Sequence, residues 1–561
     1  MSRRVFEAVR EELRRRMPSP SGTGGEELAR RIGVAFDAFP PRTDPDDPWL
    51  GGPPGDYAWL AEYEDLPDGP RDADRVLGAA ARALHGQLRW HSPSTLFNMT
   101  PQPLLDTAAV TAVTGLYSPN ALWDFCSAGV IEVERQLVRQ FARRAGWPDT
   151  AGGVFSFGGK AGLLYAVRMG LNRCLPGSSR TGLPPGPAPA VVTTAHNHDS
   201  LESVCALLGL GTDACVRVPA PPGTRAEPDA IAGAVDALLA QGRPVACVVL
   251  SGGNILHNDI DPVRPVTAAL DRVRARHALP YRPLVHFDTV VTWPWLFFTD
   301  YDFAGDPLGL GAELAGRVRA TTDLVSQVRE ADSMTIDFHK TGLAPYSSSL
   351  FLTRDAAELH HWVEGGRGET VHRPHGENAL LHTIEHSRGA APVLAAWVAV
   401  QSVGVDGFRV YLANLLMANR AFMDLLPSRG FELLTPFSDG VASVYRPVPP
   451  DGPADFAGLL DAEPPVLEAA NNYTHALFRL LAGYEGNPYS RVVLGHLPAY
   501  GRGRGGEPVA ALRLVPGSVF LDEAACSRIA ERMEQVKKAL DVAVLFGPEE
   551  LNGTPVYHVP E

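Results

Sequence analysis

A lysine that directly follows a histidine, at the end of a short apolar run, is the residue of this sequence best suited to covalent chemistry. Lys340 lies in ADSMTIDFHKTGLAPYSSS, residues 331–349. Burial removes part of the hydration of an amine, so the neutral form becomes more accessible for attack on a carbonyl carbon. A lysine in this context is more often a surface residue at a strand end. Lys340 is therefore a candidate Schiff-base residue that needs support from other segments.

A carboxylate ends a second apolar run, LVHFDTVV at residues 284–291. If this run is a strand, Asp288 lies at its carboxyl end, where open α/β sheets bind their ligands. An acidic side chain there can keep a pyridine nitrogen protonated, which turns the ring into an electron sink. A helix cap or a loop aspartate would give the same local pattern.

A glycine pair offers a place for an anion. In FSFGGKAGLL, residues 155–164, Gly158 and Gly159 separate an expected strand from an expected helix. Glycines allow a tight turn there, and the free amides and the dipole of a helix N-terminus attract a phosphate. Such pairs are common before helices, so this signal is not specific.

Two further segments follow expected strands. In TAHNHDSLESV, residues 194–204, His198 could stack on a planar ligand or carry a proton, and His196 competes for that role. In VLSGGNILHNDIDPV, residues 249–263, a turn of small residues around Asn254 has room for a flat cofactor, although it could be an ordinary loop. The order of the segments therefore carries more weight than either residue.

The elements that must bring these residues together are short apolar runs, which alternate with helical segments from about residue 150. The expected strands are 153–157, 190–194, 244–250, 283–287, 333–336 and 348–352, and the clearest helices between them are 161–174, 227–240 and 264–277. Strands buried on both faces and linked by helices predict a mostly parallel sheet covered on each side. We expect this sheet to extend to about residue 400.

The two ends of the chain have other patterns. Before the sheet we expect loops at 17–25 and 39–56 and helices at 26–37, 71–89, 104–116 and 129–145. After it we expect a helix at 407–429, strands at 431–434, 441–448 and 510–515, and a closing helix at 522–543. The expected domains are 1–100, a helical N-terminal segment, 101–400, a large α/β domain, and 401–561, a small α+β domain.

Composition narrows the class of protein. The 561 residues carry a formal charge of −14, which argues against a nucleic-acid binder. The sequence has no run of 18 or more apolar residues and no apolar signal segment in residues 1–20, so neither a membrane span nor secretion is expected. The six cysteines have no zinc spacing, no metal site is expected, and a reducing cytoplasm is the expected location.

Taken in order, the segments resemble the group II pyridoxal-phosphate-dependent amino-acid decarboxylases, the family of glutamate, aromatic amino acid and diaminobutyrate decarboxylases. The resemblance covers about residues 90–400 and includes NMTPQPLLD at 98–106 and IEHSRGAAPVLAAW at 384–397. It implies the type I fold of pyridoxal-phosphate enzymes and pyridoxal 5'-phosphate as the cofactor. The DFHK tetrad that ends at Lys340 looks closer to the diaminobutyrate branch than to the Asn-Pro-His-Lys form of the animal enzymes.

The resemblance implies three catalytic roles at matching positions. Lys340 would carry the Schiff base, and Asp288 would pair with the pyridine nitrogen. His198, in an H-x-S pattern with Ser200, would stack on the cofactor ring. The implied reaction is loss of CO2 from an L-amino acid, or an amino-acid-like metabolite, bound to the cofactor, which gives the amine.

It also implies how the rest of the cofactor is held. Gly158, Gly159 and the amide of Lys160 would bind the phosphate, and His339 would lie next to it. Asn254 falls near a position that is commonly threonine in the family. The family forms homodimers in which both subunits line each site, so residues 98–103 and 117–120 are candidates for substrate contacts.

This sequence departs from the family pattern near the cofactor. Val290 stands where the family usually has alanine against the ring, and its bulk could tilt the cofactor. Asp337 stands where the animal enzymes have asparagine, and a carboxylate near a phosphate is unfavourable unless it is screened or turned away.

A second departure concerns the proton that Cα receives. Relatives carry a tyrosine on a mobile loop after the lysine, but this sequence has none between Tyr346 and Tyr411. His372 and His375 are the obvious protic substitutes, and residues 364–376 are a plausible gating loop. Because family members without that tyrosine can react with O2, an aldehyde-forming oxidase is the alternative to a decarboxylase. A non-catalytic protein on the same scaffold is a third interpretation, which the joint presence of Lys340 and Asp288 disfavours.

Overall fold

The computed structural model of the chain describes most of its residues. These are 3–18, 20–22, 24–39, 44–55, 57–122, 124–195, 197–220, 225, 227–254, 256, 258–359, 379, 382–484 and 491–546. The chain forms two compact units. We call Phe97–Arg446 with Arg513–Glu523 the sheet unit, and Met1–Leu96, Pro447–Leu512 and Ala524–Glu561 the terminal unit. The three domains expected from the sequence stay a prediction.

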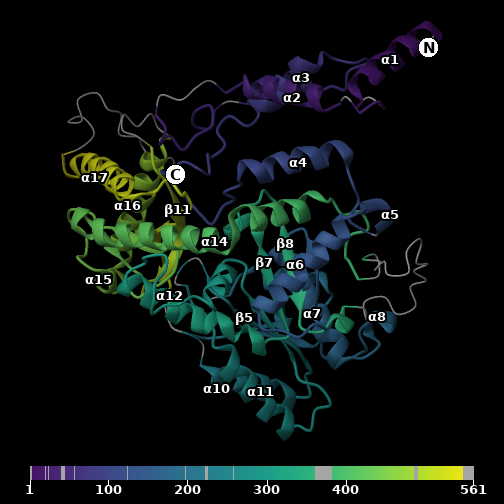
Figure 1. Cartoon of the computed structure of the whole chain (residues 1–561). Helices are drawn as coiled ribbons and strands as arrows, with labels where there is room; N and C mark the ends of the chain where they lie inside the picture. Colours follow the sequence, from purple (N-terminus) through teal and green to yellow (C-terminus); the bar gives the residue numbers. More distant parts are fainter. Residues whose placement is uncertain are drawn as a thin grey trace. The chain divides into compact units, whose positions relative to one another are not determined.

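A seven-stranded sheet organises the sheet unit (Figure 1). Its strands are β2 (Gly152–Ser156), β3 (Ala190–Thr194), β4 (Cys215–Val218), β5 (Val245–Ser251), β6 (Leu284–Asp288), β7 (Ser333–Asp337) and β8 (Ser349–Thr353). They lie in the order β2-β8-β7-β6-β5-β3-β4. The strands from β7 to β4 are parallel neighbours, whereas β8 runs antiparallel to both β2 and β7. The mostly parallel sheet predicted from the sequence is thus confirmed.

Alternate positions along the strands face two separate hydrophobic cores. Val248 and Phe287 join the core that contains α6 (Val130–Arg144), α10 (Pro228–Ala240), α11 (Val263–Arg276), α12 (Ala312–Val325) and α14 (Ala391–Leu425). Val249 and Phe351 join the core that contains α7 (Gly159–Cys174) and α9 (Ser200–Leu207). Every residue of β5 to β8 is buried, which explains why these strands read as continuous apolar runs. Figure 1 shows α10 and α11 side by side at the lower edge of the view.

Two glycines let helix α7 lie close against the sheet. A Cβ on Gly162 would come within 2.1 Å of Thr335 Oγ1, and one on Gly170 would come within 2.4 Å of the carbonyl oxygen of Ala246. No side chain fits in either gap, so both positions need glycine. The close approach aims the N-terminus of α7 at the edge of the sheet where the parallel strands end.

The remaining elements of the sheet unit are mostly short. They are α4 (Leu105–Tyr117), α5 (Asp124–Ser127), α8 (Ser178–Thr181), α13 (Phe338–Thr341), β9 (Phe431–Leu433) and β10 (Ser443–Pro447). The last described strand of the sheet ends at Thr353, so the expected extension to residue 400 is wrong. The helix expected at 407–429 begins earlier, at Ala391, because two helical segments join end to end across a kink at Gly404, where φ is 62°.

Helix α14 also has the length and composition of a membrane span, and among the described helices it alone does. Its side chains Val393, Phe408 and Leu415 lie in the same core as the sheet. The helix packs against α4 and α6, and 28% of its most apolar stretch is buried.

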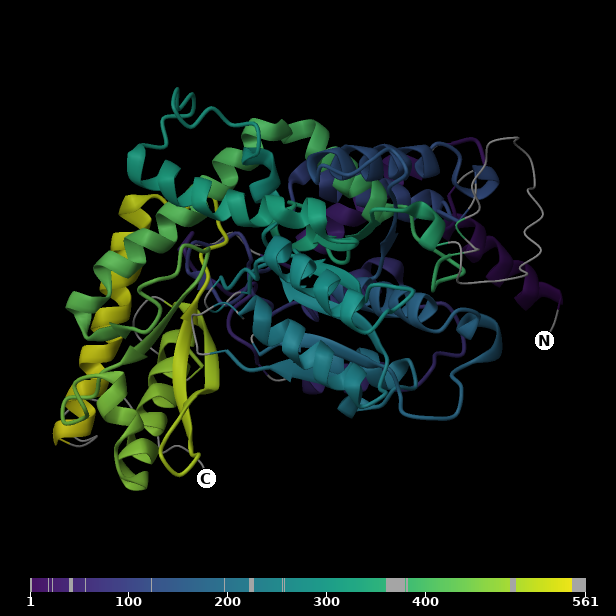
Figure 2. The same ribbon diagram turned by 90° about the horizontal axis from the view of Figure 1, so that it is seen from below.

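The terminal unit is built from both ends of the chain. Its elements are α1 (Arg3–Arg16), α2 (Gly24–Phe36), α3 (Ala73–Arg82), β1 (Thr95–Leu96), α15 (Phe456–Leu460), α16 (Pro464–Ala482), β11 (Val493–Arg502), most of β12 (Pro508–Leu514) and α17 (Glu523–Phe546). In Figure 2, β11 and β12 are the long neighbouring strands drawn in yellow. The sequence predicted α2, α3, β12 and α17, but it gave no sign of β11 or α16.

Candidate active site

The candidate residues lie at one edge of the sheet, after five of the six strands that end there. The parallel strands β3, β5, β6 and β7 end there, and Ser251 at the end of β5 is in register with Asp288 at the end of β6. β2 runs in the same direction as β7, because both are antiparallel to β8 between them. This edge therefore collects the glycine turn after β2, the loops after β3 and β5, Asp288 and the lysine after β7.

Lys340 lies in α13, the single helical turn that continues directly from β7. Its Nζ is 2.9 Å from Oδ2 of Asp337, and the other oxygen of that carboxylate accepts a hydrogen bond from Ser349 Oγ at 2.5 Å. Burial by itself would lower the pKa of Lys340, but Asp337 and then Asp288 outweigh it and raise this pKa. The side chain is thus held as an ammonium ion at the strand ends.

Asp288 presents a buried carboxylate with an oxygen left over. Its Oδ1 is buried and has no hydrogen-bond partner among the described residues. Burial raises the pKa of Asp288, although the charges of Lys340 and His198 and the amide of Val290 act in the opposite direction. A protonated ring nitrogen supplies the N–H donor and the positive charge that this oxygen lacks. Asp288 therefore fits the pyridine nitrogen of the expected cofactor.

The glycine turn lies close to the carboxylate that holds the lysine. Gly158 is the N-cap of α7, with a φ of 147° that disfavours other residues and open space where a Cβ would stand. A Cβ on Gly159 would come within 3.1 Å of both Asp337 Oδ2 and Val290 Cγ1. The first amides of a helix have no acceptor inside it, so those of Gly159 and Lys160 suit a phosphate.

His198 is oriented by its own loop. Nδ1 of His198 accepts a hydrogen bond from the Ser200 amide at 3.0 Å, and the His198 amide donates to Asn197 Oδ1 at 2.8 Å. Because Nδ1 accepts, the proton of the neutral ring lies on Nε2. His198 is exposed.

Arg217 of β4 holds the backbone of this loop, and sequence reasoning missed it. Its guanidinium donates to the carbonyl oxygens of Thr194, Ala195, Asn197 and His198 at distances of 2.9 to 3.4 Å. Glu202 Oε1, 2.6 Å from Arg217 Nε, completes the arrangement. A single arginine in a four-residue edge strand has no motif that could have revealed this role.

His339 and Tyr346 lie next to the lysine. His339 Nδ1 is 3.0 Å from the Ser348 carbonyl oxygen, and the centroids of the His339 and Tyr346 rings are 4.9 Å apart. Burial lowers the pKa of His339, which favours the neutral ring at pH 7. Burial also raises the pKa of Tyr346, although Lys340 opposes the shift. Tyr346 marked only the limit of a tyrosine-free stretch in the sequence, and nothing there placed it beside the lysine.

Four expected site residues need a separate statement. Asn254 uses its side chain within its own loop, since Nδ2 donates to Asp259 Oδ2 at 3.1 Å and Oδ1 accepts from the Leu256 amide at 2.8 Å. Its contact with a cofactor stays a prediction. His375 lies outside the described residues, as do His372, His196 and the whole of the expected gating loop, so its role also stays a prediction.

The segment 98–103 lies beside the turn that follows the lysine. The amide of Leu104 donates to the carbonyl oxygen of Leu343 at 3.2 Å. Arg513 Nη2 donates to the carbonyl oxygen of Phe97, next to this segment, at 3.3 Å, and burial lowers the pKa of Arg513 to about 10. A half-buried guanidinium of this kind suits an anionic group, and the sequence did not single it out.

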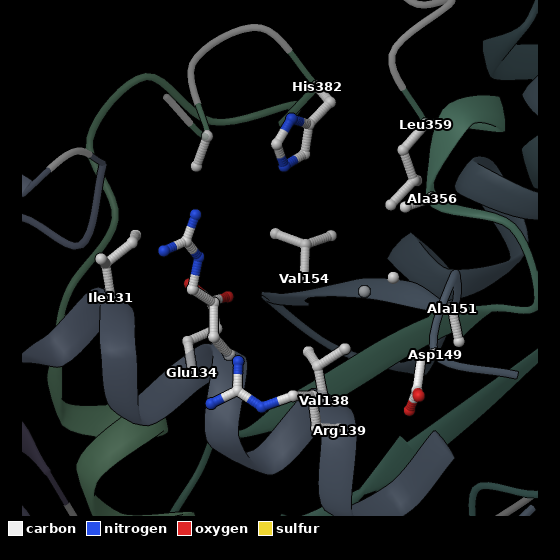
Figure 3. Close-up of a pocket in the computed structure, with 14 residues that line it drawn as sticks. Ile131, Glu134, Val138, Arg139, Asp149, Ala151, Val154, Ala356, Leu359 and His382 are labelled. Carbon is white, nitrogen blue, oxygen red and sulfur yellow. The ribbon is translucent and has the colours of Figure 1, made fainter. Parts of the chain in front are cut away.

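A separate cavity of about 240 Å³ lies near the start of β2 (Figure 3). Glu134 and Arg139 of α6 and Val154 of β2 line it, and Figure 3 shows His382 across the space from them. None of the strand-end residues described above lines this cavity. It is therefore distinct from the candidate site.

Comparisons with known proteins find amino-acid decarboxylases among the relatives of this chain. No protein-family model matches the chain. Over 396 residues the chain is 24% identical to an L-2,4-diaminobutyrate decarboxylase of Acinetobacter baumannii, which covers 67% of this chain and 72% of that protein. Over 307 residues it is 24% identical to the cysteine sulfinic acid decarboxylase of Rattus norvegicus, which covers 54% of this chain and 56% of that protein.

Solved structures share the fold over nearly the whole chain. Mouse CSAD in its apo form superposes with a TM-score of 0.74 at 17% identity and covers 91% of this chain and 98% of that chain. Oryza sativa TDC with PLP and tryptamine superposes with a TM-score of 0.73 at 16% identity and covers 93% of this chain and 99% of that chain. The type I fold predicted from the sequence is confirmed.

Proposed function

Because this chain is a member of the group II pyridoxal-phosphate-dependent amino-acid decarboxylases, we propose that it removes the carboxyl group of an amino acid as CO2 and releases the amine. One observation carries this proposal: an ammonium group, Lys340, and a buried carboxylate, Asp288, lie at the ends of neighbouring strands, and one oxygen of Asp288 has no hydrogen-bond partner among the described residues. A lysine for the cofactor aldehyde and an acid for its ring nitrogen are the two groups that this chemistry needs.

The chain's own residues would hold the cofactor and keep a proton on its ring nitrogen. Pyridoxal 5'-phosphate, when bound, supplies an aldehyde and a ring that withdraws the electron pair left at Cα. Lys340 Nζ would bond to the aldehyde carbon, and Asp288 would keep a proton on the ring nitrogen. His198 would cover one face of the ring with its Nε2–H turned away from its own loop. The amides of Gly159 and Lys160 would hold the phosphate at the start of α7.

The proposal is tested with a panel of amino acids given to the cofactor-loaded protein. CO2, O2 uptake and the mass of the product are followed together. We expect CO2 and an amine in equal amounts, without O2 uptake. An aldehyde formed with O2 consumption, peroxide and ammonia would instead support the oxidase interpretation, and absence of CO2 from every amino acid would contradict the proposal.

Lys340→Ala should abolish covalent attachment of the cofactor. With the unsubstituted chain we expect an absorbance band in the near-visible and, after borohydride reduction, a stable adduct on the peptide that contains Lys340. The sequence has only four lysines, 160, 340, 537 and 538, so mass spectrometry can assign the adduct without ambiguity. Lys538→Ala, at an exposed residue of α17, is the matched control and should keep both signals.

We also propose that two copies of the chain form a homodimer through α4. Leu105, Val113 and Tyr117 are exposed on one face of this apolar helix, at 90%, 52% and 69%. Such a face is suited to a protein partner. A second copy on α4 would lie near the segment 98–103, which continues directly into this helix. We also propose the cytoplasmic location that the cysteines led us to expect. The expected roles of His375 and Asn254 are likewise proposals.

A further inference from the structure

Asp337 contacts Lys340 in a way that the proposed reaction does not by itself require. We propose that Asp337 is a positioning residue, which holds the ε-amino group of Lys340 as an ammonium ion whenever that group is not bonded to a carbonyl carbon, and thereby sets the pH at which this chain captures its aldehyde cofactor. This inference rests on the proposed function, because it takes Lys340 as the residue that captures the aldehyde.

The contact is built into the end of β7. Asp337 is the last residue of the strand and Lys340 lies three residues later, on the first helical turn, where their side chains meet at 2.9 Å. Asp337 is only 1% exposed, and its Oδ1 accepts from Ser349 Oγ on the neighbouring strand β8. Ser349 thus fixes the carboxylate and leaves Oδ2 to the lysine.

The other titratable groups that face Lys340 act more weakly. Asp288, on β6, is the second carboxylate that raises the pKa of the lysine, and burial raises the pKa of Asp288 so that its negative charge is itself disfavoured. His339 Nε2 lies 3.6 Å from Asp337 Oδ2, and burial lowers the pKa of His339. Burial raises the pKa of Tyr346, so its phenol is uncharged at neutral pH. Asp337 is therefore the direct counter-ion of the lysine.

Capture of an aldehyde needs the neutral amine. The ammonium first gives one proton to solvent, the amine nitrogen then forms a bond to the aldehyde carbon, and the aldehyde oxygen leaves as water. A carboxylate that stabilises the ammonium lowers the fraction of neutral amine, and one pKa unit changes that fraction roughly tenfold below the pKa. Removing the charge of Asp337 should therefore speed capture at neutral pH.

The first experiment measures the rate of capture between pH 6 and pH 10, roughly the range around an ordinary lysine pKa. Cofactor-free chain, Asp337→Asn and Ser349→Ala are each mixed with pyridoxal phosphate and, separately, with pyridoxal. The near-visible absorbance follows the reaction. For Asp337→Asn we expect capture at pH 7 to be roughly tenfold faster and the pH midpoint to move down. Ser349→Ala keeps the carboxylate but removes the hydrogen bond that fixes it, so its midpoint should move down by less than that of Asp337→Asn.

Pyridoxal separates the two effects that a carboxylate near a phosphate could have. A shift of the same size with pyridoxal and with pyridoxal phosphate supports the inference, because only the amine is common to both. A shift seen with pyridoxal phosphate alone would show that Asp337 acts on the phosphate and would overturn it. An unchanged midpoint in Asp337→Asn would overturn it as well.

A second experiment reads the lysine without any cofactor. An acylating reagent that reacts only with neutral amines is applied across the same pH range, and labelling at each of the four lysines is quantified by mass spectrometry. Lys340 should be labelled at lower pH in Asp337→Asn than in the unsubstituted chain, while Lys538 serves as the internal control. If Asp337→Asn does not fold, as judged by circular dichroism, Asp337→Ser gives the same comparison.

The two hypotheses fail in distinguishable ways. If the unsubstituted chain captures neither aldehyde at any pH, the proposed function is wrong. If it captures both, and Lys340 is labelled at the same pH with and without the Asp337 carboxylate, only the inference about Asp337 is wrong.

Discussion

At the scale of single residues, the carboxylate of Asp288 at the sheet edge is suited to bind a cationic group. Asp288 is buried with an oxygen that no described group satisfies, and burial raises its pKa. A buried carboxylate in this state lowers stability when it is ionised, until a cation occupies the space beside it. Asp337 differs, because Lys340 and Ser349 both contact it.

Asp288→Asn should therefore stabilise the cofactor-free protein at pH 7. Because the folded-state pKa of Asp288 is raised, the carboxyl group favours folding while it is protonated, and this contribution is lost as pH rises through that pKa. Asparagine removes the charge, so we expect a gain of about 1 kcal/mol in the free energy of unfolding at neutral pH. Urea denaturation measures it.

Lowering the pH gives the control for this prediction. Once the carboxyl group of the unsubstituted chain is protonated, the two proteins should have nearly equal stability. With pyridoxal phosphate bound the order should reverse at pH 7, since the ring nitrogen then loses its acidic partner. Equal stability of the two cofactor-free proteins at every pH would contradict our account of Asp288.

At the scale of elements, the sequence predicts buried strands well. β3 has the expected bounds, and β5 and β6 are each shifted by one residue, because a strand covered on both faces is a continuous apolar run between polar residues. β4 was missed because it is short and its first three residues are only half-buried. The position of β8 between β2 and β7 leaves no local signal, since strand order depends on contacts between distant segments.

In the candidate site, too, features with a local sequence signal could be predicted, and features that depend on contacts between distant segments could not. Lys340, Asp288 and the glycine turn could be predicted to share one edge, because parallel strands end on the same side of a sheet. The partner of Lys340 could be suspected from the three-residue spacing of Asp337. The hold of Arg217 on the His198 loop could not, because it depends on β4 lying next to β3.

The close approach of α7 to the sheet yields a prediction at this scale. Gly162→Ala should destabilise the protein by roughly 1–3 kcal/mol, because the new methyl group would overlap Thr335. Gly233→Ala, in α10, is the matched control, since no atom lies within 4 Å of the position of its Cβ. That substitution should be neutral or should stabilise by up to about 1 kcal/mol. Chemical denaturation compares them, and equal effects would contradict the packing described for α7.

At the scale of the whole molecule, the exposed apolar face of α4 is the feature that most needs a partner. Apolar residues scattered singly over a surface are ordinary, but Leu105, Val113 and Tyr117 share one face of a single helix. A second copy of the chain would cover that face and add residues near the segment 98–103.

The double variant Leu105→Asp with Val113→Asp should therefore shift the protein from dimer to monomer. Two carboxylates in the centre of an apolar contact would be desolvated without partners. Light scattering after gel filtration measures the mass, and Leu207→Asp, at a residue of α9 with 66% exposure, is the matched control. If the double variant remains a dimer while Leu207→Asp becomes a monomer, the interface does not lie on α4.

The place of β8 has a consequence for synthesis in the cell. β8 is the last strand of the seven-stranded sheet to be translated, yet it lies between β2, the first, and β7. Until β8 has left the ribosome, β2 has no neighbouring strand in the sheet, and only the packing of α7 on β5, β6 and β7 brings the glycine turn near Lys340. A nascent chain that stalls before Ser349 should stay colourless in the presence of vitamin B6 aldehydes, and loading should begin only after this strand has inserted.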